Sequence, residues 1–460
     1  MTGWSGVRLR PTRDRLIVGA AMLVLLILSV HQIKAKAFWY DEAVSLANVR
    51  LPFDRFVANI AGDEVNGALY WILLAFWRLL GEGEARVRFL SVLCVVATVP
   101  LLYVIGRRHV GSAGALAGCV LFAVDPFVIE YAQEARMYAL AMLVSSAAVL
   151  SWSFATETDR RRWWVAYAVL ATASLYTHFF CGFVVLGMGI TWLLGLVPRT
   201  RRSVIAQAAI VLAGVPLALF VLGTGAGRLS WIEPLGETGV SAVLGKFGAG
   251  QVALAALLYG CAIAAIPARG AAQVERVAPV VAWWLTPLVA GLMLSMSTSL
   301  LVPRYFIVSL PPMMLLAGAG AVRIGGLLGR RRWGLPIATA IVSVAILLGL
   351  GPLGDWYGQT RTGWRDAAAW VSRTAQPGDR IAYHLERGQI PFANYLRRHD
   401  RAWPREASLE DLRMAPGRSW IVLYAIGNQQ YDALRDSLPG YRVVASKKFE
   451  DIRVQLLERP

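Results

Sequence analysis

The sequence predicts an α-helical polytopic membrane protein with about eleven transmembrane helices and a small C-terminal α/β domain. Composition is the first reason. Of the 460 residues, 57% are hydrophobic and only 16% are charged, with a mean hydropathy of +0.52, whereas soluble globular proteins carry roughly 25% charged residues. The second reason is that apolar segments long enough to cross a bilayer recur along most of the chain.

The spans can be placed one by one, because a helix needs about 20 apolar residues to cross the hydrocarbon core. The first, at residues 16–33, could instead be the core of a cleaved signal peptide ending at Ala35-Lys36-Ala37. A retained signal anchor is favoured, because the segment is long enough to span and other spans follow it. These lie near residues 87–106, 111–129, 138–155, 163–178, 179–197, 203–222, 239–266, 279–298, 303–322 and 334–352.

Arginine-rich segments predict which side of the membrane each loop faces. One precedes the first span, and the others lie at 107–108, 160–162, 199–202, 267–276 and 330–332. All six fall on one side if the spans alternate, and the excess of Lys and Arg marks that side as cytoplasmic. The N-terminus is then cytoplasmic, and the net charge of +17 requires no nucleic-acid partner.

The hydrophilic C-terminal part predicts a separate extracytoplasmic α/β domain. "GWRDAAAWVSRTAQPGDRIAYHL" indicates a helix, a Pro-Gly turn and a strand, and "RSWIVLYAIG", "NQQYDALRDSLPG" and "YRVVASKKFEDIRVQLLER" continue the alternation. We therefore expect a membrane domain over residues 1–354 and a mixed-sheet domain over 355–460. The external loop 34–86 of the membrane domain has helical apolar spacing that suits juxtamembrane helices lying in the interface.

The stretch "AFWYDEAVSLAN" begins this external loop and places two carboxylates, Asp41 and Glu42, beyond the first span. Adjacent residues of a helix point about 100° apart, so the two acids cannot perform the same task. Acids in the first turn of a helix also stabilise its dipole. The residues alone therefore leave both a helix start and a reaction centre open.

Further motifs give the chain a family resemblance. "WYDEA" is followed by "N-x-x-LYW" and later by "EYAQEARMYAL" (130–140), "YTHFF" (176–180) and "PRYFIVSLPPMMLLAG" (303–318). Together they resemble the GT-C superfamily of polytopic glycosyltransferases. The most similar members are the family of protein O-mannosyltransferases and lipid A aminoarabinose transferases, glycosyltransferase family 39.

The resemblance implies a GT-C fold, a polyprenyl-phosphate sugar as donor and an external active site. Asp41 matches the catalytic base of the family, and Glu42 is expected to orient the acceptor or hold the loop. Glu64 aligns with an acid associated with a metal ion or the donor phosphate. Where many relatives have histidine this chain has Asn66, which removes an imidazole from that position.

The leaving group of such a donor is a lipid phosphate, so the site needs fixed positive charge. Arg136 of "EARMY" and Arg304 of "PRY" lie at the outer ends of spans and are candidates, because a guanidinium offers a fork of donors to phosphate oxygens. Tyr138 and Tyr305 accompany them. Each arginine could instead be an interfacial anchor.

Four further residues complete the expected site. His178 in "LYTHFF" could ligate a divalent metal, touch the phosphate or bond to an interfacial neighbour. Asn66, Tyr70 and Glu134 are expected to support the acceptor or the loop. No cofactor is assigned, and a divalent metal at Glu64 or His178 is left open.

These inferences predict an inverting glycosyltransferase that moves a monosaccharide, of the mannose or arabinose type, to an extracytoplasmic acceptor such as a cell-envelope glycan, lipid or protein. The partners are the lipid-linked donor, the acceptor and the bilayer. A transporter or flippase of lipid-linked sugars is the alternative, although the polar residues gather on one face instead of the midplane and no inverted repeat or pair of broken helices is visible in the sequence. A non-catalytic assembly protein and a polymer ligase of another GT-C branch are also compatible with these motifs.

Overall fold

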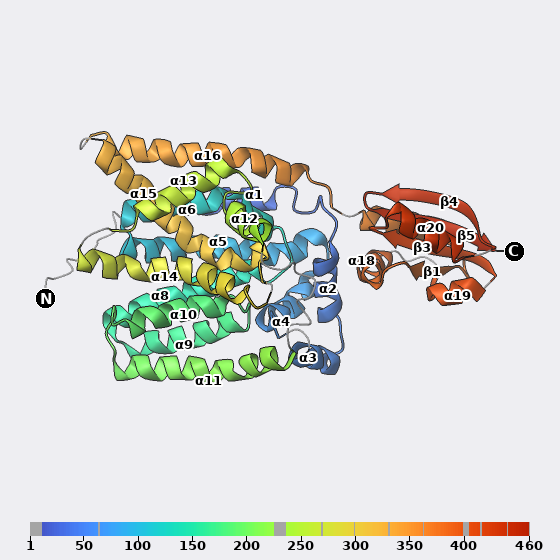
Figure 1. Ribbon diagram of the computed structural model, residues 1–460, viewed down its shortest axis with the longest axis horizontal. Coiled ribbons are helices and arrows are strands. Elements are labelled where there is room, and N and C mark those ends of the chain that lie inside the picture. Colours follow the sequence, from blue (N-terminus) through green and yellow to red (C-terminus); the bar gives the residue numbers. More distant parts are fainter. Residues whose placement is uncertain are drawn as a thin grey trace. The chain divides into compact units, whose positions relative to one another are not determined.

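The computed structural model describes residues 12–62, 65–224, 236–267, 270–298, 300–329, 332–361, 363–398, 404–414, 416–438 and 440–459. The chain forms two compact units (Figure 1). The first contains residues Met1–His31, Ile60–Trp77 and Arg88–Tyr357. The second contains Gln32–Asn59, Arg78–Val87 and Gly358–Pro460, so that it joins part of the first external loop to the C-terminal region.

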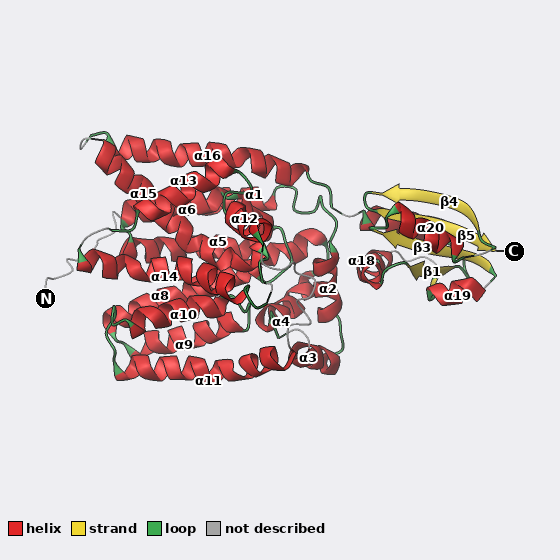
Figure 2. Ribbon diagram, in the orientation of Figure 1, coloured by secondary structure: helices red, strands yellow, loops and turns green. Residues whose placement is uncertain are grey.

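Helices joined by turns and loops are the regular secondary structure of the first unit's described residues (Figure 2). Most of its helices are apolar on all sides, which is typical of membrane spans. Its helices are α1 (Arg13–Val30), α4 (Ala68–Trp77), α5 (Glu84–His109), α6 (Ser112–Val124), α7 (Pro126–Ala132), α8 (Tyr138–Thr158), α9 (Arg161–Leu175), α10 (Cys181–Leu193), α11 (Arg201–Thr224), α12 (Glu237–Lys246), α13 (Val252–Ala264), α14 (Ala271–Leu294), the 3₁₀ helix η3 (Pro303–Ser309), α15 (Leu310–Leu328) and α16 (Gly334–Gly358).

Within the described residues, six helices are long and apolar enough to cross a membrane, or seven if the bent pair α6 and α7 forms one span. The chain is thus a multi-pass membrane protein, but the expected count of about eleven spans is not confirmed. One reason is the segment 239–266, expected as a single span, which forms α12 and α13 separated by "FGAGQ". Ala249 and Gly250 both adopt positive φ there, which ends the helix.

The segment expected as the span 111–129 is also divided. α6 and α7 meet at Asp125 with a bend of 56°. Pro126 occupies the first position of α7, and the Asp125 carboxylate accepts hydrogen bonds from the backbone N–H of Phe127 at 3.0 Å and Val128 at 3.1 Å. The Asp-Pro pair therefore both caps and bends this segment.

Small residues allow the helices at the centre of the first unit to approach closely. α15 packs against α6 and α13, and a side chain added at Gly318 would collide with the backbone of Gly118. Such close backbone contact is typical of membrane helices, where packing replaces the hydrophobic drive of water.

The second unit contains α2 (Tyr40–Val49), the 3₁₀ helix η1 (Arg78–Leu80) and the predicted C-terminal α/β domain. α3 (Phe53–Gly62) has an exposed apolar face, as expected for a helix of the membrane interface. The remaining elements are α17 (Trp364–Thr374), β1 (Arg380–Tyr383), α18 (Glu386–Leu396), β2 (Arg405–Glu406), α19 (Leu409–Met414), β3 (Gly417–Tyr424), α20 (Asn428–Asp436), β4 (Arg442–Phe449) and β5 (Ile452–Arg459).

The strands form one mixed sheet in the order β2-β1-β3-β5-β4. β1 pairs in parallel with β2 and β3, whereas β5 pairs antiparallel with β3 and β4. Ile421 and Leu423 of β3 and Leu457 of β5 contribute to the core that the helices cover. A small mixed-sheet domain is therefore confirmed, while α18, β2 and α19 are additions that the sequence patterns did not predict.

Candidate functional site

The site begins at the corner between α7 and α8, where residues 133–137 leave helical structure. Gln133 fixes this corner, because its amide donates to the backbone oxygens of Ser29 at 3.0 Å and His31 at 2.6 Å. Its Oε1 accepts from Trp356 Nε1 at 2.9 Å. Glu134 is 2% exposed, and its backbone oxygen accepts from the Ser91 hydroxyl at 2.6 Å. The corner is thus held by three helices of the first unit.

Arg136 is presented from this corner against an aromatic ring. Its guanidinium carbon lies 5.3 Å from the centre of the Trp71 ring, a cation–π distance. Trp71 and its neighbour Tyr70 are fully buried on α4. Trp71 was not among the predicted site residues, although it belongs to the "LYW" motif that led to Tyr70.

Arg304 reaches the same end of α8 from η3. Its Nε donates to the Tyr138 hydroxyl at 3.0 Å, and its guanidinium carbon lies 5.8 Å from the Tyr305 ring centre. Pro303 starts η3 and pre-sets the backbone that presents Arg304. Two segments about 165 residues apart in the sequence therefore bring their arginines and tyrosines together.

His178 lies between these two tyrosines. Its ring centre is 5.5 Å from that of Tyr138 and 5.4 Å from that of Tyr305, and the residue is 2% exposed. The backbone N–H of Phe180 donates to Nδ1 at 3.2 Å. Nδ1 is then unprotonated, so the proton of the neutral ring resides on Nε2. Within the described part of the chain Nε2 makes no hydrogen bond, which leaves one buried donor for an outside oxygen.

Asn66 ties the external loop to this histidine turn. Its Oδ1 accepts from the Phe179 N–H at 3.0 Å, and the Leu69 N–H donates to the Tyr176 carbonyl oxygen at 3.0 Å. A metal-binding histidine normally donates through its second nitrogen, which the Phe180 contact prevents for His178. His178 therefore does not fit a metal site, and the described residues contain no group of three or more His, Cys, Asp or Glu that could hold a metal.

The paired acids lie in the second unit, at the start of α2. Glu42 is completely buried; its carboxylate pairs with Arg361 at 3.3 Å and accepts from the Trp39 N–H at 3.4 Å, closing the helix start. The Asp41 side chain is partly exposed, and its backbone oxygen accepts from the Ser45 hydroxyl at 2.8 Å. The two acids thus have different surroundings, and Arg361 is a partner that no sequence motif indicated.

The structure divides the expected residues between the two units. Asn66, Tyr70, Glu134, Arg136, Tyr138, His178, Arg304 and Tyr305 belong to the first unit, and Asp41 and Glu42 to the second. Glu64 lies outside the described residues. We call Arg136, Tyr138, His178, Arg304 and Tyr305 the arginine–tyrosine cluster.

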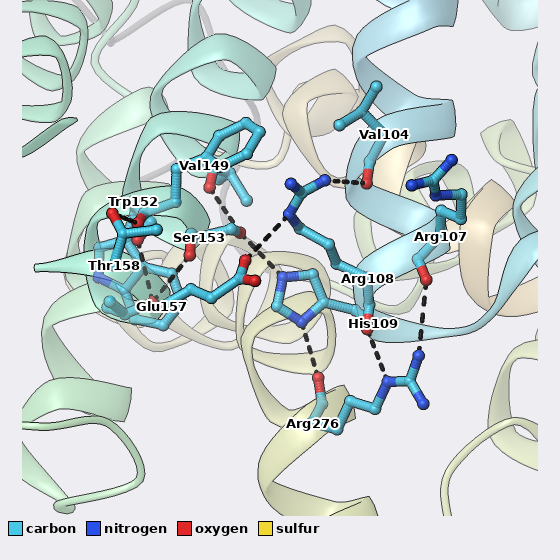
Figure 3. Close-up of polar contacts among 12 residues, drawn as sticks. Val104, Arg107, Arg108, His109, Val149, Trp152, Ser153, Glu157, Thr158 and Arg276 are labelled. Carbon is cyan, nitrogen blue, oxygen red and sulfur yellow. Dashed lines mark hydrogen bonds and ion pairs between the residues drawn. The ribbon is translucent and has the colours of Figure 1, made fainter. Parts of the chain in front are cut away.

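A second polar cluster lies at the other end of α8 (Figure 3). His109 of α5 contacts the Arg276 carbonyl oxygen through Nδ1 at 2.7 Å and the Ser153 hydroxyl through Nε2 at 2.8 Å. Arg276 Nε donates to the Arg108 carbonyl oxygen at 2.6 Å, and Arg108 Nε to Glu157 at 3.4 Å. We call these five residues the arginine–histidine cluster; it joins α5, α8 and α14.

Comparisons with known proteins agree with the sequence motifs. A family model described as dolichyl-phosphate-mannose-protein mannosyltransferase matches residues 68–224, about a third of the chain. This segment contains five of the expected site residues, Tyr70, Glu134, Arg136, Tyr138 and His178. A search of curated proteins finds no match.

Solved structures resemble the whole chain. ArnT from Cupriavidus metallidurans is 16% identical with a TM-score of 0.63, and the match covers 96% of this chain and 97% of that one; the same protein bound to undecaprenyl phosphate matches at 15% identity and the same TM-score. The oligosaccharyltransferase AglB from Archaeoglobus fulgidus, in complex with an inhibitory peptide and a dolichol-phosphate, is 10% identical with a TM-score of 0.58. The match covers 92% of this chain and 71% of that one. The arabinofuranosyltransferase AftD from Mycobacteria is 14% identical (TM-score 0.54), covering 96% of this chain and 41% of that one. These likenesses show the fold.

Proposed function

We propose that this chain, which has the fold of the GT-C superfamily of membrane glycosyltransferases, is an inverting glycosyltransferase. It would move a monosaccharide of the mannose or arabinose type from a polyprenyl-phosphate donor to an extracytoplasmic acceptor, such as a cell-envelope glycan, lipid or protein. The observation that carries the proposal is the arginine–tyrosine cluster, because three separate segments of the chain supply it.

The chemistry of this cluster suits a lipid phosphate. Arg136 and Arg304 supply positive charge, and His178 presents an N–H donor through Nε2. When the bond between the anomeric carbon and the phosphate oxygen breaks, negative charge develops on the phosphate. Donors already fixed in place stabilise that charge more than they stabilise the bound substrate, which lowers the barrier.

Asp41 is proposed as the general base. The acceptor oxygen would attack the anomeric carbon from the side opposite the phosphate, the bonding electrons would leave with the phosphate, and the Asp41 carboxylate would take the hydroxyl proton. Glu42 is assigned to holding the loop, because its buried carboxylate already pairs with Arg361 and closes the start of α2. A residue so engaged is poorly placed to accept a further proton.

The similar structures support a lipid-linked donor. One is bound to undecaprenyl phosphate and another to a dolichol-phosphate. The mannosyltransferase description of the matching family model supports a mannosyl group, and the arabinofuranosyltransferase supports an arabinosyl group. Both sugars therefore belong in the first set of donors to be assayed.

The proposal includes an orientation and a domain division. The arginine-rich loops support a cytoplasmic N-terminus, and in that orientation the active site and the α/β domain at 355–460 would face outward from a membrane domain at 1–354. A cysteine introduced at Gly440 should react with an impermeant reagent on intact cells, whereas one at Arg160 should react only after lysis. The reverse labelling pattern would contradict the orientation.

Asp41→Asn tests the proposed reaction, because asparagine keeps the shape of the side chain but cannot take a proton. General-base catalysis contributes roughly 10²–10⁴-fold, so transfer from polyprenyl-phosphate mannose or arabinose to envelope acceptors should fall by about that factor. Donor binding should be retained, and Glu42→Gln should mainly lower thermal stability. Full transfer activity in Asp41→Asn would remove the base from the mechanism.

A further inference from the structure

Two adjoining cavities in the second unit lie between α2 and α18. Their volumes are about 250 and 430 Å³, and Arg50, Asn394 and Arg397 line both of them. Small-molecule sites span roughly 300–1,000 Å³, so the two together have room for a small ligand. We call them the α2–α18 pocket.

The charges around this pocket are only partly balanced. Arg50 donates from Nε and Nη2 to Glu82 at 3.0 and 2.6 Å, and these bonds hold the pKa of Glu82 below its usual value. Arg398 donates to Glu84 at 3.1 Å. The exposed Arg397 side chain makes no hydrogen bond or ion pair within the described residues, so its charge remains available at the pocket.

The buried side-chain amide of Asn394 has a partner for its oxygen but none, within the described residues, for its nitrogen. The residue is 3% exposed, and its Oδ1 accepts from Arg50 Nη1 at 2.8 Å. Its Nδ2 finds no acceptor among the residues that the structure describes. Buried amide donors are normally hydrogen-bonded, and Asn394 borders both cavities. An oxygen atom of a ligand in the pocket would satisfy this donor.

The rest of the lining suits a hydroxylated ligand. Gln389 Nε2 donates to Glu406 Oε2 at 2.9 Å, which orients the carboxylate and leaves further lone pairs to accept hydroxyl protons. Ala43 and Ala47 of α2 form a small apolar surface on the other wall. A cation, an amide donor, an oriented carboxylate and a small apolar surface together match an acidic sugar.

We propose that the α2–α18 pocket binds an acidic saccharide, a sugar that carries a carboxylate or a phosphate. Its anionic group contacts Arg397, a ring or hydroxyl oxygen accepts from Asn394, and its hydroxyl groups donate to Glu406. Resting on the proposed function, we assign this saccharide to the acceptor.

The position of the pocket on α2 decides which part of the acceptor it holds. At about 100° per residue, Ala47 and Arg50 lie within about 60° of one another, on either side of Ala43. Asp41 lies about 160° from Ala43, on the opposite face of the helix. The pocket therefore holds a sugar unit remote from the hydroxyl that Asp41 deprotonates, and it contributes to acceptor affinity without taking part in the chemical step.

Direct binding tests the pocket without any need for turnover. The full-length protein in lipid nanodiscs would be titrated with glucuronic acid, glucose 6-phosphate, neutral glucose and inorganic phosphate, and binding followed by saturation-transfer NMR. Glucuronic acid, glucose 6-phosphate or both should bind at least about tenfold more tightly than glucose or inorganic phosphate, and the stronger of the two identifies the anionic group. Equal binding of glucose, binding of phosphate alone, or no binding of either acidic sugar would overturn the proposal.

A matched pair of variants locates the binding. Arg397→Gln should lower the affinity for the acidic sugar by about tenfold or more, which is the contribution of a charge-assisted contact. Arg387→Gln removes an exposed arginine of α18, the helix that Arg397 follows, outside the pocket, and should leave binding unchanged. Because Arg397 is exposed, the fold should survive its substitution, which an unchanged thermal midpoint would verify. Unaltered binding in Arg397→Gln would show that the sugar binds elsewhere.

Kinetics separate this proposal from the proposed function. In a transfer assay, Arg397→Gln should raise the KM for the acceptor while kcat and the donor KM stay constant. An unchanged acceptor KM would overturn the acceptor assignment. If wild-type protein binds the acidic sugar but transfers none from either donor, the proposed function fails and the saccharide site stands.

Discussion

The two ends of α8 carry polar clusters of different kinds. Tyr138 begins the helix within the arginine–tyrosine cluster, and Ser153 and Glu157 belong to the arginine–histidine cluster near its other end. With a rise of about 1.5 Å per residue, the two ends of this 21-residue helix are roughly 30 Å apart, the thickness of a hydrocarbon core. The same helix therefore presents both clusters at levels where a membrane would end.

The two clusters differ in what satisfies their side chains. In the arginine–histidine cluster both nitrogens of His109 have oxygen partners, and Arg276 binds a backbone carbonyl left over at the end of α5. In the arginine–tyrosine cluster aromatic rings surround His178, whose Nε2 has no hydrogen bond within the described residues. A cluster whose polar groups are hydrogen-bonded to one another serves to join helices. A cluster with a buried N–H that has no acceptor within the described residues is suited to binding a ligand.

Arginine substitutions at the two ends should separate these roles most strongly. Arg304→Gln removes a charge proposed to contact the donor phosphate, a contact worth roughly 1.5–3 kcal/mol, so turnover should fall by about one to two decades. Arg108→Gln removes the ion pair with Glu157, which is partly exposed and worth about 0.2–1 kcal/mol. It should lower the thermal midpoint slightly and leave turnover unchanged.

The assay would compare kcat/KM with polyprenyl-phosphate mannose or arabinose for both purified variants, with the thermal midpoint measured in the same detergent. Equal turnover in Arg304→Gln and wild type would make Arg304 an interfacial anchor. A large loss of turnover in a well-folded Arg108→Gln protein would instead move the functional importance to the other end of α8.

Histidine substitutions in the two clusters should give a smaller difference in turnover than the arginine substitutions. His178→Asn can still accept from the Phe180 N–H but lacks a donor at the position of Nε2, whereas His178→Gln can place an amide N–H close to that position. A neutral hydrogen bond contributes about 0.5–1.5 kcal/mol, so His178→Asn should lose roughly three- to tenfold in turnover. His178→Gln should lose less.

His109→Gln at the other end is the control, and it should change stability only. Measurement of kcat and donor KM for all three variants would test this order. If His178→Asn and His178→Gln lose stability equally and keep full turnover, the buried donor at Nε2 has no catalytic use.

The sequence predicted where helices and candidate site residues lie better than it predicted whether an apolar segment forms one unbroken helix. The motifs that carry the family resemblance, together with the charge that a lipid phosphate requires, pointed to Arg136, Tyr138, His178 and Arg304, which stand out against apolar surroundings. Hydropathy did not reveal that 239–266 divides into two helices, since a window average does not register the positive-φ turn at Ala249 and Gly250. The partners Trp71 and Arg361 were also missed: an aromatic residue in an apolar helix and an arginine in a polar loop carry no distinguishing pattern, and only tertiary packing gives them a role.

The smallest expected effect concerns Asp125, which begins the segment leading to the arginine–tyrosine cluster. Its carboxylate accepts from two backbone N–H groups at the start of α7. Loss of such a cap costs about 0.5–2 kcal/mol, so Asp125→Ala should lower the thermal midpoint and unsettle the corner that presents Arg136. Asp125→Asn keeps a capping oxygen and should behave nearly as wild type.

Because the arginine–histidine cluster has its own helix-end contacts, Asp125→Ala should increase hydrogen exchange at residues 126–137 and leave residues 153–157 unchanged. Exchange that rises equally at both ends of α8 would mean that the two clusters form one cooperative unit, and the distinction between them would then concern chemistry alone.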